Sequence, residues 1–295
     1  MTEDHLNPTS RGDLRTDALT VNDYLLFSTT PCNAIPEYQE NLSYKDGLLI
    51  GAYLGDGSTY TRSIKGVEYS TVTLSLNKDK VEELYAEGIL QDWNITIGAN
   101  NVVSATTNSA EVYQLIKKWV SGNYAHEKSL NLQCLSQNIS FRQGIVDGFY
   151  ITDGGSSNRI YTTSSVLCSD IETVLTSLGI PSIIDISDRT DEPVVIRGIS
   201  YKRNYPLYCI RMYAKTNKRS SDGIYIKRNN DIFFKIKSIE EVDYDSEYVY
   251  CYEMADQREP YFTPPSCLAI SVAEKESSTT NSRRSNCFMY SSLIC

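Results

Sequence analysis

The chain has 295 residues, a net charge of −9 and 41% hydrophobic residues, which is enough apolar material for two domains with cores of their own. It contains no run of 18 apolar residues and opens on a polar, acidic segment, so we expect a soluble intracellular protein with no membrane partner and no signal peptide. The eight cysteines include no CxxC pair, which argues against a structural zinc site.

Four stretches of different character follow one another along the chain. Residues 1–40 contain short strand-like and turn-like pieces, and residues 41–220 alternate helical and strand patterns, which predicts an α+β domain. Residues 221–270 are rich in strand-forming runs. Residues 271–295 are rich in Ser, Thr, Asn and Arg up to Asn286, so we expect mostly a disordered tail there.

The central stretch contains an internal repeat with a constant offset of 97 positions. Residues 47–57 read GLLIGAYLGDG and residues 144–154 read GIVDGFYITDG. Ser43 and Ser140 precede the two copies as predicted helix N-caps, and each copy ends in Asp-Gly, a common helix stop. Each copy is therefore predicted to be one helix that begins a structural unit.

The segments after the two copies are also alike. The first copy is followed by predicted strands at 69–76 and 102–107 and predicted helices at 80–90 and 110–120. The second is followed by predicted strands at 159–163, 183–186 and 207–213 and a predicted helix at 166–178. We therefore expect two tandem pseudo-symmetric α+β units, at about 41–125 and 126–220.

Small residues recur every fourth position in both predicted helices. Gly47, Gly51 and Gly55 share one helix face, as do Gly144, Gly148 and Thr152 in the second copy. Glycine inside a helix costs roughly 0.5–1 kcal/mol relative to alanine. Because that cost recurs on one face, we expect the two helices to pack together with their backbones in close approach.

Such packing would bring the helix C-termini together, with Asp56 and Asp153 side by side. Two carboxylates at the negative ends of two helix dipoles repel each other, and a divalent cation would relieve that repulsion. Few oxygen ligands with room for water and phosphate suit Mg²⁺. The pattern predicts metal-assisted phosphodiester hydrolysis, with one carboxylate for each strand of a duplex; two ordinary helix-stop turns are the alternative.

The net charge is negative, which is unfavourable for a DNA-binding protein, but the positive residues are concentrated in one segment. Between positions 197 and 228 the only acid is Asp222. The same stretch contains nine basic residues, which are the predicted DNA contacts: Arg197, Lys202, Arg203, Arg211, Lys215, Lys218, Arg219, Lys227 and Arg228.

Residues 49–57 and 146–154 resemble the paired motifs of LAGLIDADG homing endonucleases, and residues 126–144 resemble the lead-in to the second motif. The resemblance implies two αββαββα units related by a pseudo-twofold axis, each laying a curved sheet along the major groove. It implies a monomer that cuts a long, specific site in double-stranded DNA, in whichever compartment holds that DNA. The motif aspartates Asp56 and Asp153 would bind Mg²⁺ or Mn²⁺, with help from the carbonyls of Gly55 and Thr152.

The resemblance also implies basic side chains near the scissile phosphates. Lys202 and Lys215 are the catalytic candidates in the second unit, with Arg203 beside them, and simple phosphate contact is the alternative role for each. The strand at 102–107 in the first unit contains no lysine, so Lys78 and Lys80 are considered there instead.

The flanks resemble intein splicing (Hint) domains. Thr2 and His5 match a TxxH block, residues 19–26 match the strand that follows it, and residues 236–270 match a closing part, so 1–40 and 221–270 are interpreted as Hint-like remnants. No preceding Cys or Ser block is found, and Ser271 and Val272 stand where a closing His-Asn would be expected. We therefore expect an intein derivative that no longer splices.

Two alternatives to a site-specific double-strand endonuclease remain open. One is a DNA- or RNA-binding protein of the same fold that does not cleave. The other is an active protein-splicing or autoprocessing element.

Overall fold

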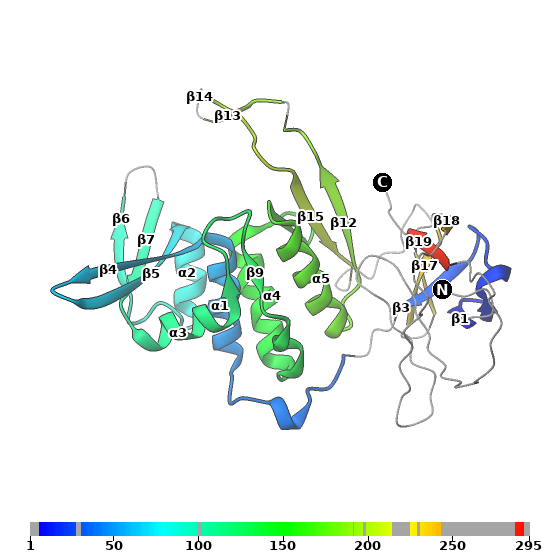
Figure 1. The fold of residues 1–295 in the computed structure, drawn as a ribbon, viewed down its shortest axis with the longest axis horizontal. Helices are drawn as coiled ribbons and strands as arrows, with labels where there is room; N and C mark the ends of the chain where they lie inside the picture. The colour runs from blue at the N-terminus through cyan, green and yellow to red at the C-terminus, as the bar shows by residue number, and fades with distance from the viewer. Residues whose placement is uncertain are drawn as a thin grey trace, which may run out of the picture. The chain divides into compact units, whose positions relative to one another are not determined.

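The computed structural model describes residues 6–27, 31–98, 102–190, 192–196, 199–213, 225–228, 231–242 and 287–291. The chain forms two compact units (Figure 1). One comprises Thr30–Tyr213, and the other combines Met1–Thr29 with Ala214–Cys295. In the described parts of the chain, no helix is long and apolar enough to cross a bilayer.

The first half of the 30–213 unit begins with a helix that ends at the first Asp-Gly pair. Ser43 caps this helix as predicted, in a capping box with Asp46. An antiparallel sheet of order β4-β5-β7-β6 follows, and two further helices pack against one face of it. The elements are α1 (Tyr44–Asp56), β4 (Gly57–Ile64), β5 (Val67–Asn77), α2 (Lys78–Ala86), β6 (Asn94–Ile97), β7 (Val102–Thr107) and α3 (Ala110–Trp119).

The second half repeats the opening helix and the sheet, with the same position of each strand in the order β10-β11-β15-β12, and its described residues contain one further helix where the first half has two. Its opening helix starts two residues earlier than a cap at the predicted Ser140 would give, because Asn138 accepts the hydrogen bond from Phe141 N and acts as the N-cap. The elements are α4 (Ile139–Asp153), β10 (Gly154–Gly155), β11 (Arg159–Thr162), α5 (Ser165–Ser177), β12 (Ser182–Ser187) and β15 (Leu207–Met212).

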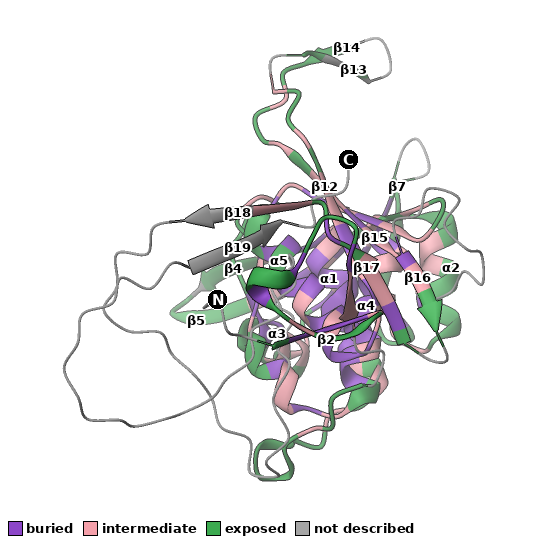
Figure 2. Ribbon diagram, turned by 90° about the vertical axis from the view of Figure 1, so that its right-hand side faces the viewer, coloured by how far each residue is buried: buried purple, intermediate pink, exposed green. Residues whose placement is uncertain are grey.

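A hairpin that the sequence patterns did not predict is inserted between β12 and β15. It consists of β13 (Val194–Ile196) and β14 (Ile199–Tyr201), which pair only with each other. Figures 1 and 2 both show it projecting from the sheet of the second half, and its described side chains are mostly exposed.

The opening helices α1 and α4 form the centre of the unit and are largely buried (Figure 2). They run parallel, because a side-chain carbon placed on Gly47, Gly51 and Gly55 would meet successively later residues of α4. On Gly51 it would lie 2.1 Å from Ile145 O, and on Gly148 it would lie 2.1 Å from Leu48 O. Each contact therefore recurs with its partners exchanged by 97 positions, and the predicted close packing of the glycine faces is confirmed.

Side chains alternate along the strands, so each sheet has one apolar face against the helices and one polar face. In β5, Val72, Leu74 and Leu76 are buried against the helices, while Thr73 and Ser75 between them lie on the opposite face. In the second half, Ile160 and Ile210 are the buried counterparts in β11 and β15. One face of each sheet is therefore left for polar side chains.

Short elements connect the halves. Strands β8 (Val120–Ser121) and β9 (Ser129–Leu130) pair after α3, and 3-10 helices cover Pro36–Tyr38 and Leu132–Ser136. Arg142, fully buried in α4, holds the segment before α1 by donating to Cys32 O (2.5 Å) and Ser177 O (3.0 Å).

The other unit draws its main sheet from both flanks of the chain, in the order β16-β17-β3-β1-β2. A separate pair is formed by β18 and β19, so part of the predicted tail, around the apolar residues 288–290, forms a strand. The remainder of 271–295 and the strand-like run at 248–252 lie outside the described residues. The elements are β1 (Leu6–Thr9), β2 (Gly12–Arg15), a 3-10 helix (Thr16–Ala18), β3 (Tyr24–Phe27), β16 (Tyr225–Arg228), β17 (Asp231–Lys235), β18 (Ser238–Val242) and β19 (Cys287–Ser291).

Candidate metal and phosphodiester site

The two motif aspartates are the last residues of the two central helices. Asp56 ends α1 and Asp153 ends α4, and the backbone turns directly into β4 and β10 at the following glycines. Because the helices run parallel with their glycine faces in contact, both C-termini lie at the same end of the pair. Both aspartates are half-buried, so their carboxylates remain accessible to a ligand.

The helix ends approach each other as closely as the helix centres do. A side-chain carbon on Gly55 would lie 2.2 Å from Thr152 Oγ1 and 3.1 Å from Asp153 Oδ2. The absent side chain of Gly55 therefore leaves the space in which Thr152 and the Asp153 carboxylate sit. Thr152 Oγ1 donates back to its own helix, at Gly148 O or Phe149 O (both 3.1 Å), which keeps this buried hydroxyl satisfied.

The two carboxylates influence each other electrostatically. Burial first, and then the negative charge of Asp56, raise the pKa of Asp153, while Lys80 and Lys128 act in the opposite direction; together these influences place it at about 6. A carboxyl group with a raised pKa next to a second carboxylate is a site with an unmet demand for positive charge.

Lys80 supplies part of that charge in the first half. Its Nζ lies 2.7 Å from Asp56 Oδ2, and both side chains are 24% exposed. Lys78, the other lysine considered from the sequence, instead lies 3.7 Å from Glu82 on the exposed side of α2. The structure therefore places Lys80, and not Lys78, beside a motif aspartate.

Lys128 is a central residue of this site that the sequence patterns did not identify. It is only 3% exposed, and burial lowers its pKa to about 8 while Asp153 and Asp56 act in the opposite direction. Its ammonium group closes the C-terminal end of α1, where unpaired carbonyls carry partial negative charge. Its three N–H donors are shared among four backbone oxygens, those of Tyr53 (2.8 Å), Leu54 (3.0 Å), Gly55 (3.2 Å) and Gly57 (2.9 Å).

The position of Lys128 is fixed by the second half of the unit. Its own carbonyl accepts a hydrogen bond from Ser164 Oγ (2.7 Å), and Ser164 also caps α5. The residue thus links the end of α1 to the start of α5. Its role could not be read from the sequence because its partners lie 71–75 positions away along the chain.

The donor set fits a hard divalent cation held partly by solvent and phosphate. Across the described residues, no cluster of three or more His, Cys, Asp or Glu side chains is present, so a closed protein cage is not formed there. Two adjacent carboxylates with few other ligands are the arrangement that Mg²⁺ accepts. The Gly55 carbonyl, a predicted ligand, already accepts a hydrogen bond from Lys128 and would have one lone pair left.

The predicted basic residues are distributed over several places. Arg211 lies in β15 and forms an ion pair with Asp185, while Lys202 and Arg203 lie between β14 and β15. Lys227 and Arg228 belong to β16 in the other unit, where Arg228 donates to Ser10 O. The predicted site residues Thr2, His5, Arg197, Lys215, Lys218 and Arg219 lie outside the described residues.

Comparison with known proteins gives structural neighbours only. No family model and no curated protein matches the chain. The homing endonuclease I-DmoI, in its mesophilic variants, is 16% identical with a TM-score of 0.40, covering 59% of this chain and 85% of its own. I-WcaI bound to its DNA recognition sequence is 10% identical with a TM-score of 0.29, covering 59% and 80%.

A third neighbour is the LAGLIDADG meganuclease I-AabMI bound to uncleaved DNA. It is 11% identical with a TM-score of 0.24, covering 56% of this chain and 78% of its own. At such identities and TM-scores, the function of this chain rests on its own residues.

Proposed function

We propose that the 30–213 unit is a site-specific double-strand DNA endonuclease of the LAGLIDADG type. The observation that carries this proposal is the parallel, glycine-faced packing of α1 and α4, which brings Asp56 and Asp153 to one end of the pair. Ordinary helix-stop turns would not need that close approach. Nor would they need two lysines placed against the same helix ends.

In this proposal, Asp56 and Asp153 hold Mg²⁺ or Mn²⁺, with the Gly55 and Thr152 carbonyls as further candidate ligands. When bound, the metal supplies Lewis-acid stabilisation of the charge that develops on a phosphodiester. Lys80 fixes the Asp56 carboxylate through its ion pair. Lys128 holds the end of α1 in position through its four carbonyl contacts, so both carboxylates are preorganised before DNA binds.

The partner in this proposal is double-stranded DNA with a long specific site, bound by a monomer. The recurrence of helix contacts with partners exchanged by 97 positions supports an internal pseudo-twofold axis. Such an axis matches the antiparallel strands of a duplex, with one carboxylate for each strand. The polar faces of the two sheets supply the surface for base and phosphate contacts.

The second unit is proposed to be a Hint-like remnant of an intein derivative that no longer splices. The feature that supports this is its sheet, which joins strands from before and after the 30–213 unit, as insertion of an endonuclease into another domain requires. Self-cleavage of a fusion protein with tags at both ends would contradict the loss of splicing. We expect one intact band on a denaturing gel.

Selection of cleaved sites from a randomised duplex library tests the proposed endonuclease. The full-length protein is incubated with the library in Mg²⁺, and parallel reactions contain EDTA or Asp153→Asn. We expect a defined set of cleaved sequences in Mg²⁺ alone. Retention of specific duplexes without metal-dependent cutting would favour the non-cleaving DNA-binding alternative.

A further inference from the structure

Two arginines stand in a row across the sheet of the second half, in register with the residue that follows Asp153-Gly154. Gly155 in β10 pairs with Arg159 in β11, Arg159 pairs with Arg211 in β15, and Ile183 in β12 completes the row. Neighbouring strands lie about 4.8 Å apart. The backbones of Arg159 and Arg211 are therefore roughly one and two strand spacings from the candidate metal-binding segment.

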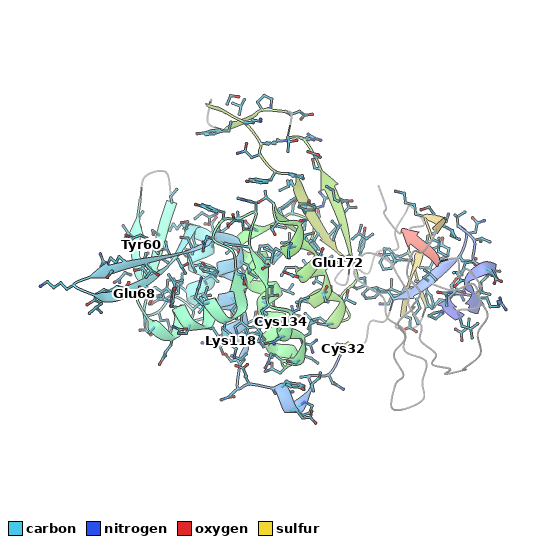
Figure 3. The ribbon with its side chains drawn as sticks, in the orientation of Figure 1. Cys32, Tyr60, Glu68, Lys118, Cys134 and Glu172 are labelled. Atoms are coloured by element: carbon cyan, nitrogen blue, oxygen red, sulfur yellow. The ribbon has the colours of Figure 1, made fainter. Side chains whose placement is uncertain are left out.

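Both arginines belong to the sheet face opposite the helices. Ile160 and Ile210, adjacent to them in sequence, are fully buried on the face that contacts α4 and α5. Since side chains alternate along a strand, Arg159 and Arg211 lie on the other face, where both are partly exposed. Figure 3 shows side chains on both faces of this sheet, with Glu172 on the α5 side.

The charges of this pair are only half compensated. Like charges directly opposite each other in an antiparallel ladder are destabilising. Arg211 forms an ion pair with Asp185. Among the described residues, Arg159 has no ion pair, and the Nε atoms of both arginines are buried without a hydrogen-bond partner. The row therefore holds an excess positive charge, contributed by the partly exposed Arg159, on a chain whose net charge is −9.

The equivalent row in the first half is uncharged. Ser58, the second residue after Asp56, pairs with Thr73, which pairs with Thr106, which pairs with Asn94. Threonines thus occupy the two places that arginines occupy in the second half. The requirement for a positive row is therefore specific to the Asp153 side and is not part of the shared sheet architecture.

We propose that Arg159 and Arg211 together bind a pair of hydrogen-bond acceptors of the DNA duplex beside Asp153. The acceptors are either two oxygens of a backbone phosphate or the O6 and N7 atoms of a guanine, both of which match the planar guanidinium fork. The inference rests on the proposed function and adds to it a one-sided recognition element. The target half-site next to Asp153 contacts arginine at this row of the sheet, and the other half-site meets threonines at the equivalent row.

The test is duplex selection by the full-length protein, without Mg²⁺, from a randomised library. Wild type is compared with Arg159→Gln, with Arg159→Lys and with the charge-matched control Lys45→Gln, an exposed lysine at the start of α1, at the opposite end of that helix from Asp56. If the acceptors belong to guanine, Arg159→Gln loses preference for guanine at one position and binds the selected site about tenfold or more weakly. Arg159→Lys then loses the same preference, because the ammonium group lacks the planar fork.

If the acceptors belong to a phosphate, Arg159→Gln weakens all sequences equally and lowers the slope of log Kd against log salt by about one, while Arg159→Lys keeps that slope. Lys45→Gln should show neither change. Arg159→Gln with wild-type affinity, base preference and salt slope would overturn this inference alone, provided that its melting curve shows a folded protein. A wild type that selects no sequence and cuts none would overturn the proposed function and this inference together.

Discussion

The two halves of the 30–213 unit deliver their aspartates identically but surround them differently. Each half ends a glycine-faced helix in Asp-Gly and continues into a sheet of the same strand order. In the first half, Lys80, three residues after the α2 N-cap, pairs with Asp56 at 2.7 Å. In the second half, the position equivalent to Lys80 in α5 is the buried Leu167, three residues after the N-cap. The basic residues of the second half that are discussed above, Arg159 and Arg211, belong to its sheet.

This contrast shows which features of the fold tolerate the least change in sequence. Along the two glycine pairs Gly47/Gly144 and Gly51/Gly148, the helix contact leaves no room for a side chain, so these positions are the same in both halves. The positive side chains differ, because Lys80 reaches Asp56 from helix α2, whereas the second half carries Arg159 and Arg211 on its sheet. The halves are alike where backbones touch and differ where side chains act.

The largest effect is expected when a bulky side chain is placed in the contact between α1 and α4, from either helix. Gly51→Leu and Gly148→Leu would each place a side chain about 2.1 Å from a backbone oxygen that packing holds in place. We expect each variant to lose more than about 4 kcal/mol of unfolding free energy, and the two losses to be similar. Chemical denaturation measures this, with the exposed Lys45→Leu on the same helix as control. A folded Gly51→Leu with unchanged melting would refute the contact.

A smaller effect sharpens the contrast between α2 and α5. The position eight residues after the N-cap is Tyr85 in α2 and Glu172 in α5. Tyr85 is 53% exposed, whereas Glu172 is 3% exposed. Burial raises the pKa of Glu172 to about 8 from an ordinary 4.5, so the folded state binds the proton more tightly than the unfolded state. Stability is then fully present below about pH 4.5 and falls as pH rises through 8.

Glu172→Gln removes this dependence. At pH 9 we expect the variant to be more stable than wild type by on the order of 3 kcal/mol, and at pH 4.5 the difference should shrink toward zero. Thermal melts across that range measure it, and Tyr85→Phe is the matched first-half control. Equal pH profiles for Glu172→Gln and wild type would show that the carboxyl group is solvated.

The smallest expected effect makes the first half more like the second. Lys80→Met removes the partner of Asp56 and resembles the leucine found at this position in α5. We expect cleavage of the selected target to fall roughly tenfold or more, about 1.4 kcal/mol or more in barrier height. Unfolding free energy should change by less than about 1 kcal/mol, since partly exposed ion pairs stabilise little. Lys78→Met, whose ion pair is exposed, should cut like wild type.

The sequence was sufficient for features that depend on local patterns. Glycines spaced by four predicted the helix contact, and the 97-position offset predicted that Asp56 and Asp153 would end equivalent helices. Strand 102–107 was predicted with the bounds that the structure gives. Ser140 failed as a cap because Asn138, an equally good capping residue, lies two positions earlier.

Features that depend on tertiary contacts could not be predicted in the same way. Lys128 was given no role from the sequence, since the carbonyls that bind it belong to a distant helix end. Arg159 was missed because its pairing with Arg211 depends on strand register across an inserted hairpin. Lys80 could be named only as one of two candidates, because which lysine reaches Asp56 depends on the orientation of α2.

Separate measurement of cutting and binding in Asp56→Asn and Asp153→Asn tests the central claim most directly. Each substitution preserves shape and removes one negative charge from the shared site. We predict that either variant loses double-strand cleavage of the selected duplex by roughly a thousandfold or more while its Kd changes less than about tenfold, because most binding contacts lie on the sheets. Cleavage at the wild-type rate in either variant, or binding lost as severely as cleavage, would contradict a metal centre built from these two carboxylates.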